Sequence, residues 1–244
     1  LGLFTLRYAA SALAGQRKFV EELNALKQGG HGHLSIGAIT GSAAHVLIAS
    51  VAEIQRLRPL LVLKVLEQSS DQLIVWLAEH KIDLMIGRFT DDAQRTQFQY
   101  ERLSSEPMQV VAGAHHPLRG TPDLDLAELS HWPWILYPAS TAVRKVSDDI
   151  FARNGLMLTS GMVETPSFLF ALEMMQMTDM LSLQPKALVE HYFHRGLLTP
   201  IPIELPDRMP DFGMVTRQGE NPTPPTLAFM DILRRVSNSV NETA

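Results

Sequence analysis

Short strand-like runs and longer helix-like runs of apolar residues alternate along most of the chain. Residues 34–39 alternate apolar with small side chains, as a short strand does. Thr40 and Ser42 follow this run, and an apolar helix is expected over residues 43–57. The two hydroxyls therefore stand where the N-cap of that helix belongs, beside backbone N–H groups without helical partners. Such a corner suits a carboxylate, sulfate or phosphate, although Ser42 would look the same if it only capped its helix.

The same strand, corner and helix plan continues through the first half of the chain. Residues 60–66 are almost continuously apolar, which predicts a strand covered on both faces in a parallel sheet. Ser69 and Ser70 form the next corner, a helix is expected over 71–81, and residues 82–87 predict a third strand. The pattern is βαβαβ with right-handed crossovers. Because ligands of such sheets lie at the carboxyl ends of the strands, both hydroxyl corners fall on the ligand side.

The second half of the chain repeats this plan. Strands are expected over residues 98–103 and 107–112, and the second of these leaves the first sheet. Three strand–corner–helix units then follow, with strands over 134–137, 161–164 and 180–183 and helices over 142–154, 168–177 and 186–193. Their corners carry Ser140, Thr141, Thr165, Ser167 and Gln184. A proline-rich crossing segment over 198–205, a strand over 212–216 and an amphipathic helix over 225–240 complete the chain.

A long helix without proline is expected before the first strand, over residues 3–27. Leu6, Leu13, Val20 and Lys27 recur every seven residues, which indicates a coiled-coil seam that pairs with another chain. An ordinary amphipathic helix packed on its own domain is the alternative. Glycines in residues 28–32 end this helix and form a hinge.

Composition narrows the function classes. The chain has 244 residues, 45% of them hydrophobic and 19% charged, as in a water-soluble globular protein, and no apolar run is long enough to span a membrane. The net charge of −5 argues against this chain being a nucleic-acid-binding surface. The absence of cysteine excludes disulfides and thiolate metal sites. The chain starts without Met or a signal peptide, so we expect a piece of a longer, cytoplasmic protein.

Neither a cofactor, a metal site nor a catalytic centre is predicted. His31 and His33 lie in the hinge, and His115 with His116 precedes a proline, so turns explain both pairs. The chain contains no G-x-S-x-G, H-E-x-x-H or P-loop motif. Three functions remain to be compared: a ligand-sensing regulator fragment, a periplasmic solute-binding protein and an enzyme on the same scaffold. The missing catalytic set disfavours the enzyme, and the missing export signal disfavours the periplasmic protein.

In their order and spacing, several segments resemble the effector-binding half of LysR-type transcriptional regulators. They are residues 21–27, 33–37, 73–79, 82–87, 116–118 and 138–144. The resemblance implies an α/β fold of two Rossmann-like subdomains with type-2 periplasmic-binding-protein architecture. It divides the chain into a linker (dimerisation) helix and hinge over 1–32, subdomain I over 33–108 with 208–244, and subdomain II over 109–207. It also implies a winged helix-turn-helix that would precede this chain.

The resemblance further implies which residues contact ligand in the cleft between the subdomains. The family positions fall on Thr40, Ser42, Ser69, Ser70, Phe89, Ser140, Thr141, Thr165 and Gln184. Each has a purely structural alternative: Ser70 as a plain N-cap, Phe89 packed on a loop, and Gln184 facing solvent.

The resemblance also implies partners. The expected effector is a small organic, sugar or aromatic acid, and no membrane is involved. Promoter DNA and RNA polymerase would be partners of the full-length protein, but DNA would not bind through this chain. A homodimer or homotetramer is expected, with helix 43–57 beside the last helix of another subunit, through Leu227, Met230 and Leu233. The runner-up function remains a periplasmic solute-binding protein.

Overall fold

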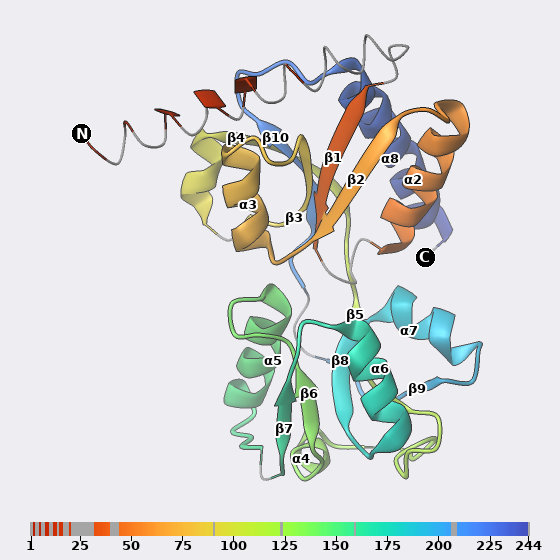
Figure 1. Ribbon diagram of the computed structural model, residues 1–244. Helices are drawn as coiled ribbons and strands as arrows, with labels where there is room; N and C mark the ends of the chain where they lie inside the picture. Colours follow the sequence, from red (N-terminus) through yellow and green to blue (C-terminus); the bar gives the residue numbers. More distant parts are fainter. Residues whose placement is uncertain are drawn as a thin grey trace. The chain divides into compact units, whose positions relative to one another are not determined.

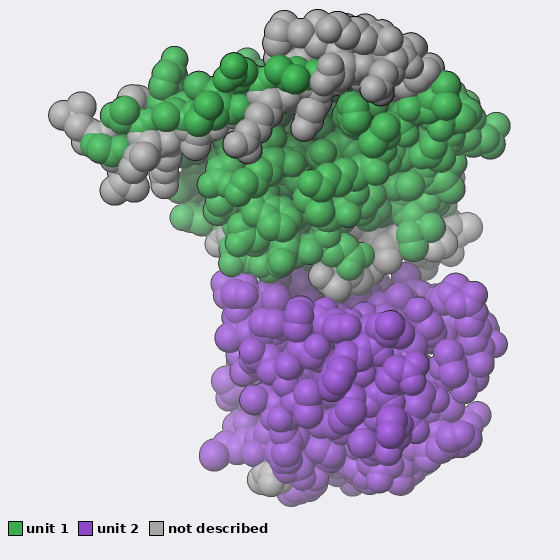
Figure 2. Space-filling view, viewed as in Figure 1, with its two compact units in different colours: residues 1–39, 43–104, 211–244 green, residues 40–42, 105–210 purple. Residues whose placement is uncertain are grey.

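The structure is a computed structural model that divides into two compact units (Figure 2). Unit 1 comprises residues 1–39, 43–104 and 211–244, and unit 2 comprises residues 40–42 and 105–210. The described residues are 2, 5, 8–9, 12–13, 15–16, 20, 32–39, 44–89, 91–122, 124–158, 160–205 and 209–243. Most of the predicted linker helix and hinge, and the corner residues Thr40 and Ser42, therefore lie outside the described residues.

Unit 1 is a five-stranded mixed sheet with helices on both faces. Its strands are β1 (His33–Ala38), β2 (Val62–Glu67), β3 (Leu84–Gly87), β4 (Phe98–Ser104) and β10 (Phe212–Arg217), in the order β2-β1-β3-β10-β4. β1 pairs in parallel with β2 and β3, whereas β10 pairs antiparallel with β3 and β4. The helices are α2 (Ala44–Leu57), α3 (Ser70–Ala78), the 3₁₀ helix η1 (Asp92–Thr96) and α8 (Pro224–Thr243). Figure 1 shows α2 beside α8, with α3 on the other side of β1.

The strand predicted over residues 60–66 is real, but its predicted surroundings are wrong. β2 is the last strand of the sheet, and Val62 and Val65 remain 52% and 40% exposed. The crossover from β1 through α2 places β2 on one side of β1, and the next crossover places β3 on the other side. An apolar run predicts a strand, but it does not predict whether that strand lies in the middle of the sheet or at its edge.

Unit 2 repeats this arrangement with other segments. Its strands follow the order β7-β6-β8-β5-β9. They are β5 (Met108–Gly113), β6 (Trp134–Leu136), β7 (Met162–Glu164), β8 (Leu181–Pro185) and β9 (Leu198–Pro200). The helices are α4 (Leu126–Leu129), α5 (Ala142–Arg153), α6 (Phe168–Met177) and α7 (Lys186–Phe193). β5 belongs to this second sheet, as predicted, and β9 forms inside the segment expected only to cross between subdomains.

Each sheet is buried by side chains that alternate between its faces. In unit 2, Val110 and its neighbour Val111 belong to different core clusters because successive strand residues point to opposite faces. Val143 and Ile150 of α5 join the cluster of Val110, while residues of α6 and α7 join that of Val111. In unit 1, Phe229 and Leu233 of α8 are fully buried in the core. The last helix therefore packs on the first sheet, as predicted.

Candidate functional site

The corner between β2 and α3 carries two hydroxyls with different roles. Ser69 occupies the N-cap position of α3, but its side chain makes no capping hydrogen bond. The Oγ of Ser70 accepts the backbone N–H of Arg88 at 3.1 Å, so the first turn of α3 is tied to the residue that follows β3. Ser70 is therefore not a plain N-cap. Ser69 stands at the N-terminus of α3, where a helix leaves backbone N–H groups without helical partners.

Phe89 lies just beyond β3 in an aromatic and cationic group. Its ring centroid is 5.2 Å from that of Tyr100, and the Arg95 guanidinium lies 5.4 Å from the Phe89 centroid. The Tyr100 hydroxyl donates to the carbonyl of Asp211 at 2.9 Å. Burial raises the pKa of Tyr100, against an opposing effect of the Arg88 charge, so this phenol is neutral at pH 7. Phe89 thus packs on its neighbours at the carboxyl end of β3.

The corner between β6 and α5 is held by its own hydrogen bonds. Ser140 is exposed. The Oγ1 of Thr141 accepts the backbone N–H of Arg144 at 3.3 Å and donates to the carbonyl of Pro138 at 2.8 Å, so Thr141 caps α5. The side chain of Arg144 binds Asp148 at 2.8 Å and Glu164 at 2.9 Å. Because these bonds stabilise the guanidinium, the pKa of Arg144 is raised.

The corner between β7 and α6 also uses its hydroxyls locally. Thr165 Oγ1 accepts the N–H of Ser167 at 3.1 Å, and Ser167 Oγ accepts the N–H of Phe170 at 3.2 Å. Both side chains therefore fold the backbone into the first turn of α6. They satisfy backbone donors that a bound anion would otherwise find at this corner.

Gln184, on β8, is buried, and both the oxygen and the nitrogen of its side-chain amide make hydrogen bonds. Its Oε1 accepts the Tyr137 hydroxyl at 2.9 Å, and its Nε2 donates to Ser182 Oγ at 2.9 Å. Ser182 in turn donates to the carbonyl of Ile135 at 2.9 Å. Gln184 is only 1% exposed, so the alternative that it faces solvent is wrong. This network joins β8 to β6 inside the sheet.

The predicted residues gather within each unit at the carboxyl ends of parallel strands. Ser69, Ser70 and Phe89 adjoin β2 and β3 in unit 1, whereas Ser140, Thr141, Thr165 and Gln184 adjoin β6, β7 and β8 in unit 2. Sequence reasoning did not place Tyr137 at the site, and it considered Arg88 only as a cation that could add to an anion site. Arg88 directly follows a predicted strand, and Tyr137 is the last residue of another. Their positions at strand ends were the sequence signal that could have identified them.

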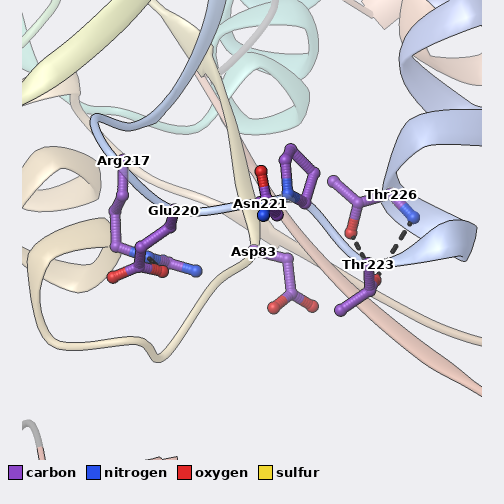
Figure 3. Close-up of a pocket in the computed structure, with 7 residues that line it drawn as sticks. Asp83, Arg217, Glu220, Asn221, Thr223 and Thr226 are labelled. Atoms are coloured by element: carbon purple, nitrogen blue, oxygen red, sulfur yellow. Dashed lines mark hydrogen bonds and ion pairs between the residues drawn. The ribbon is translucent and has the colours of Figure 1, made fainter.

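A small pocket lies at the opposite edge of the unit 1 sheet (Figure 3). It holds about 50 Å³ and is lined by Asp83, Arg217, Glu220, Asn221, Pro222, Thr223 and Thr226. None of the predicted site residues that the structure describes is among them. Asp83 precedes β3, and Arg217 ends the antiparallel strand β10, so the pocket adjoins the amino ends of the parallel strands.

The polar groups of this pocket bind one another. Arg217 donates to the carbonyls of Leu77 and Ile82, each at 2.9 Å, and to Glu220 at 2.6 Å. Glu220 also bonds His80 at 2.9 Å. Burial alone would raise the pKa of Glu220, but the hydrogen bonds and charges of Arg217 and His80 lower it overall. The group therefore joins the turn after α3 to the loop before α8.

His116 has a structural role in the turn after β5. It is 4% exposed, and its ring lies 4.5 Å from that of Trp132. Nδ1 accepts the N–H of Leu118, so the proton of the neutral ring is on Nε2, which donates to the carbonyl of Asp179. Burial lowers the pKa of His116.

Across the described ranges, no three His, Cys, Asp or Glu side chains cluster to hold a metal ion. No helix within those ranges has the length and apolarity needed to cross a bilayer.

The chain belongs to the LysR family, because the LysR substrate binding domain matches residues 27–238. GbpR of Azospirillum brasilense, named as an HTH-type transcriptional regulator, is 27% identical over 98% of this chain and 70% of its own length. GalR of Pseudomonas putida, also so named, is 25% identical over 96% of this chain and 58% of its own length. The chain spans 57% to 70% of the first four curated relatives it matches.

Solved structures agree with the fold. The effector-binding domain of QuiR in complex with shikimate has a TM-score of 0.70 at 17% identity, covering 86% of this chain and 98% of that one. HinK of Pseudomonas aeruginosa, a LysR family transcriptional regulator, has a TM-score of 0.69 at 20% identity, covering 98% and 81%. GbpR and GalR are both named as transcriptional regulators, in agreement with the prediction that the chain is not an enzyme. The α/β fold with periplasmic-binding-protein architecture is confirmed.

Proposed function

We propose that this chain binds a small organic anion between its two units and thereby controls transcription by a longer LysR-type regulator. The observation that carries the proposal is Ser69, which stands at the N-terminus of α3 with a hydroxyl that caps nothing. Helices α5 and α6 begin at the equivalent corners of unit 2. Helix N-termini favour bound anions. Shikimate and benzoate, the ligands named with the related domains of QuiR and BenM, are both carboxylates.

The regulatory mechanism follows from binding between two bodies. An anion that contacts both units favours the arrangement of the units in which both sets of contacts form. In the longer, cytoplasmic protein this arrangement would set the spacing of the DNA-binding domains, with a coupling free energy of about 1–3 kcal/mol. This chain itself carries a net charge of −5 and should not bind duplex DNA at physiological salt. Submicromolar, sequence-specific binding in a gel-shift experiment would contradict that assignment.

We also propose that the chain forms a homodimer, but with a revised surface. Met230 and Leu233, predicted to face another subunit, are 8% and 0% exposed in the core of their own unit. α8 packs on α2 of the same chain, where Arg235 binds Glu53 at 2.8 Å. Ile48 of α2 is 67% exposed and Leu227 is 47% exposed, and these side chains remain available for a partner. Light scattering at tens of micromolar protein measures the molar mass and so tests for the homodimer. A molar mass of a monomer would contradict this proposal.

The ligand proposal is tested by thermal shift with benzoate, shikimate and a wider panel of organic acids. A ligand that binds only the folded state raises the melting temperature. We expect at least one acid to do so, and no shift across the panel would contradict the proposal. Ser69→Ala and Thr40→Val should weaken that acid about ten- to a hundredfold, the effect of losing one charge-assisted hydrogen bond. The melting temperature of the empty protein should change little in both variants.

A control variant separates the ligand corner from the caps. Thr141→Val removes a cap of α5, so it should destabilise the empty protein by about 1 kcal/mol. Ser69→Ala removes no capping hydrogen bond and should leave the empty protein unchanged. If Ser69→Ala and Thr40→Val both bind the acid as tightly as the parent, the site lies elsewhere.

A further inference from the structure

We propose that His80 and Glu220 form a latch that couples effector binding at the N-terminus of α3 to the contact between subunits at the start of α8. This inference rests on the proposed function, because both the ligand corner and the dimer surface belong to it, and adds a regulatory link between them. Both latch residues lie outside the predicted ligand site. They are positioning residues, since they act through the segments that they hold.

Helix α3 ends in a Schellman motif with a histidine at the position where glycine is usual. The backbone N–H of Lys81 donates to the carbonyl of Trp76 at 2.9 Å, and that of His80 donates to the carbonyl of Leu77 at 3.2 Å. This pair of bonds defines the motif and requires a left-handed backbone at residue 80. His80 has a φ of 58°, the one positive φ outside glycine in the described part of the chain. Because a side chain there costs free energy that glycine would avoid, local backbone preference does not explain the histidine.

The imidazole of His80 reaches the loop that follows β10. Its Nε2 lies 2.9 Å from a carboxylate oxygen of Glu220. A carboxylate only accepts hydrogen bonds, so Nε2 carries the proton of the neutral ring. Nδ1 is buried and makes no hydrogen bond in the described structure. The side chain is therefore held at two costs, a left-handed backbone and a buried nitrogen without a donor, and residues held in such strained conformations are typical of switch regions.

Arg217, the last residue of β10, holds Glu220 in position for His80. It donates to Glu220 at 2.6 Å and to the carbonyls of Leu77 and Ile82, each at 2.9 Å. The carbonyl of Leu77 belongs to the last turn of α3, where carbonyls have no partner inside the helix. Figure 3 shows Arg217 and Glu220 side by side at one end of the pocket. The C-terminal end of α3 is thus attached to the segment that leads into α8.

The latch connects the ligand corner with the dimer surface over a short distance. Helix α3 has nine residues and is about 13 Å long, and Ser69 stands at its other end. On the far side of the latch, residues 221–223 alone separate Glu220 from α8. The backbone N–H of Leu227, in the first turn of α8, donates to the carbonyl of Thr223 at 2.9 Å. Leu227 is 47% exposed and belongs to the proposed dimer surface, so a displacement of α3 on effector binding is transmitted to that surface.

Coupling between two binding steps is reciprocal. If the acid favours the dimer by some factor, formation of the dimer strengthens binding of the acid by the same factor. Without the latch, both binding steps should still occur, but each should become independent of the other. A merely structural role of His80 and Glu220 would instead lower the melting temperature and leave the coupling factor unchanged.

The experiment measures the dimer Kd by sedimentation velocity with and without saturating acid. The probe is whichever acid of the thermal-shift panel raises the melting temperature of the parent most, with benzoate and shikimate tested first. In the parent, the acid should change the dimer Kd at least about fivefold. In His80→Asn the change should fall below about twofold, because asparagine tolerates the left-handed backbone but is shorter than the imidazole.

Three further variants separate the latch from general stability. His80→Gly removes the imidazole together with the backbone cost, so the coupling should be lost while the melting temperature of the empty protein does not fall. Glu220→Ala should lose the coupling, whereas Glu220→Gln, which keeps an acceptor oxygen for His80, should retain most of it. Glu79→Gln is the matched control, because Glu79 forms an ion pair with Lys81 at 2.7 Å in the same turn without bonding the loop before α8. It should couple as the parent does.

The outcomes distinguish this inference from the proposed function. If the parent binds an acid and dimerises, but its dimer Kd is the same with and without the acid, this inference is wrong and the proposed function stands. If the acid changes the dimer Kd equally in the parent and in both His80 variants, the coupling runs through other contacts and the latch is overturned. If no acid binds the parent, or the parent is a monomer, that part of the proposed function is wrong and the latch falls with it.

Discussion

Unit 1 and unit 2 arrange their strands in the same order, with three parallel strands followed by two that pair antiparallel. The sheet β2-β1-β3-β10-β4 corresponds strand by strand to β7-β6-β8-β5-β9. In both units, a strand from a distant part of the chain is inserted beside the third parallel strand. The same corners therefore recur at the same edge of each sheet. What differs is the use of the polar side chains at these corners.

In unit 2, Thr141, Thr165 and Ser167 bind backbone groups of their own corners, and Gln184 is locked inside the sheet. In unit 1, Ser69 caps nothing and Ser70 fixes the segment of Arg88. Equivalent positions in one topology thus serve as framework in one unit and as candidate ligand contacts in the other.

The largest expected effect tests whether the two units unfold separately. Gly113 of β5 packs against α6, and a Cβ there would lie 2.0 Å from the carbonyl oxygen of Met175. Gly113→Ala should therefore destabilise unit 2 by roughly 3 kcal/mol through overpacking. In a Trp76→Phe background the remaining tryptophans, Trp132 and Trp134, report unit 2 during urea unfolding.

Gly161→Ala is the control for that measurement, because nothing lies within 4 Å of its added Cβ. The same pair of variants in a Trp132→Phe, Trp134→Phe background follows unit 1 through Trp76. An equal loss of stability in both units would show that they unfold as one body and would remove the basis for treating them separately.

The second prediction tests the closed network of unit 2. Tyr137→Phe leaves the buried Oε1 of Gln184 without its donor, which should cost about 1–3 kcal/mol. The affinity for the acid should stay the same, since Gln184 faces the interior of the sheet. Tyr192→Phe, whose ring packs on Phe168, is the control and should change stability by less than about 0.5 kcal/mol. Weaker effector binding with unchanged stability in Tyr137→Phe would instead make Gln184 a ligand contact.

The third prediction is a pH dependence confined to unit 2. Burial lowers the pKa of His116 in the folded state, so the unfolded chain binds more protons below an ordinary histidine pKa of about 6.5. The stabilisation is complete above that pH and is lost as the pH falls below it, because protonation of Nδ1 breaks the bond from Leu118. His116→Gln should flatten the melting temperature between pH 7 and pH 5. The exposed neighbour His115 provides the control, and a matching change in His115→Gln would refute the assignment.

The smallest effect lies in unit 1. Ser50 of α2 is fully buried, and its Oγ makes no hydrogen bond in the described structure. Ser50→Ala should therefore stabilise the unit by about 1 kcal/mol. Ser237 of α8 is equally buried, but it donates to the carbonyl of Leu103 at 2.6 Å, so Ser237→Ala should destabilise by a similar amount. Equal signs for the two variants in chemical denaturation would contradict this account.

The sequence by itself determined most of the helices and strands and their order. The helices predicted over 168–177 and 186–193 have the bounds of α6 and α7, because an N-cap serine precedes α6 and a proline at the N-cap position precedes α7. The βαβ pattern also predicted the edge at which the candidate residues lie, since parallel strands carry their corners to one side. The short α4 and η1 were not predicted, because four or five residues hold too little periodicity.

The tertiary structure alone decided which polar groups bind one another. Ser70 and Thr165 are hydroxyl residues at equivalent corners, yet Ser70 bonds a residue 18 positions later and Thr165 bonds one 2 positions later. Gln184 meets Tyr137 across 47 positions. The order of the strands likewise decided that β2 lies at the edge of the sheet rather than inside it. Hydrophobic periodicity reports the local preference of each segment for burial, whereas hydrogen-bond partners distant in sequence depend on how the strands and helices pack.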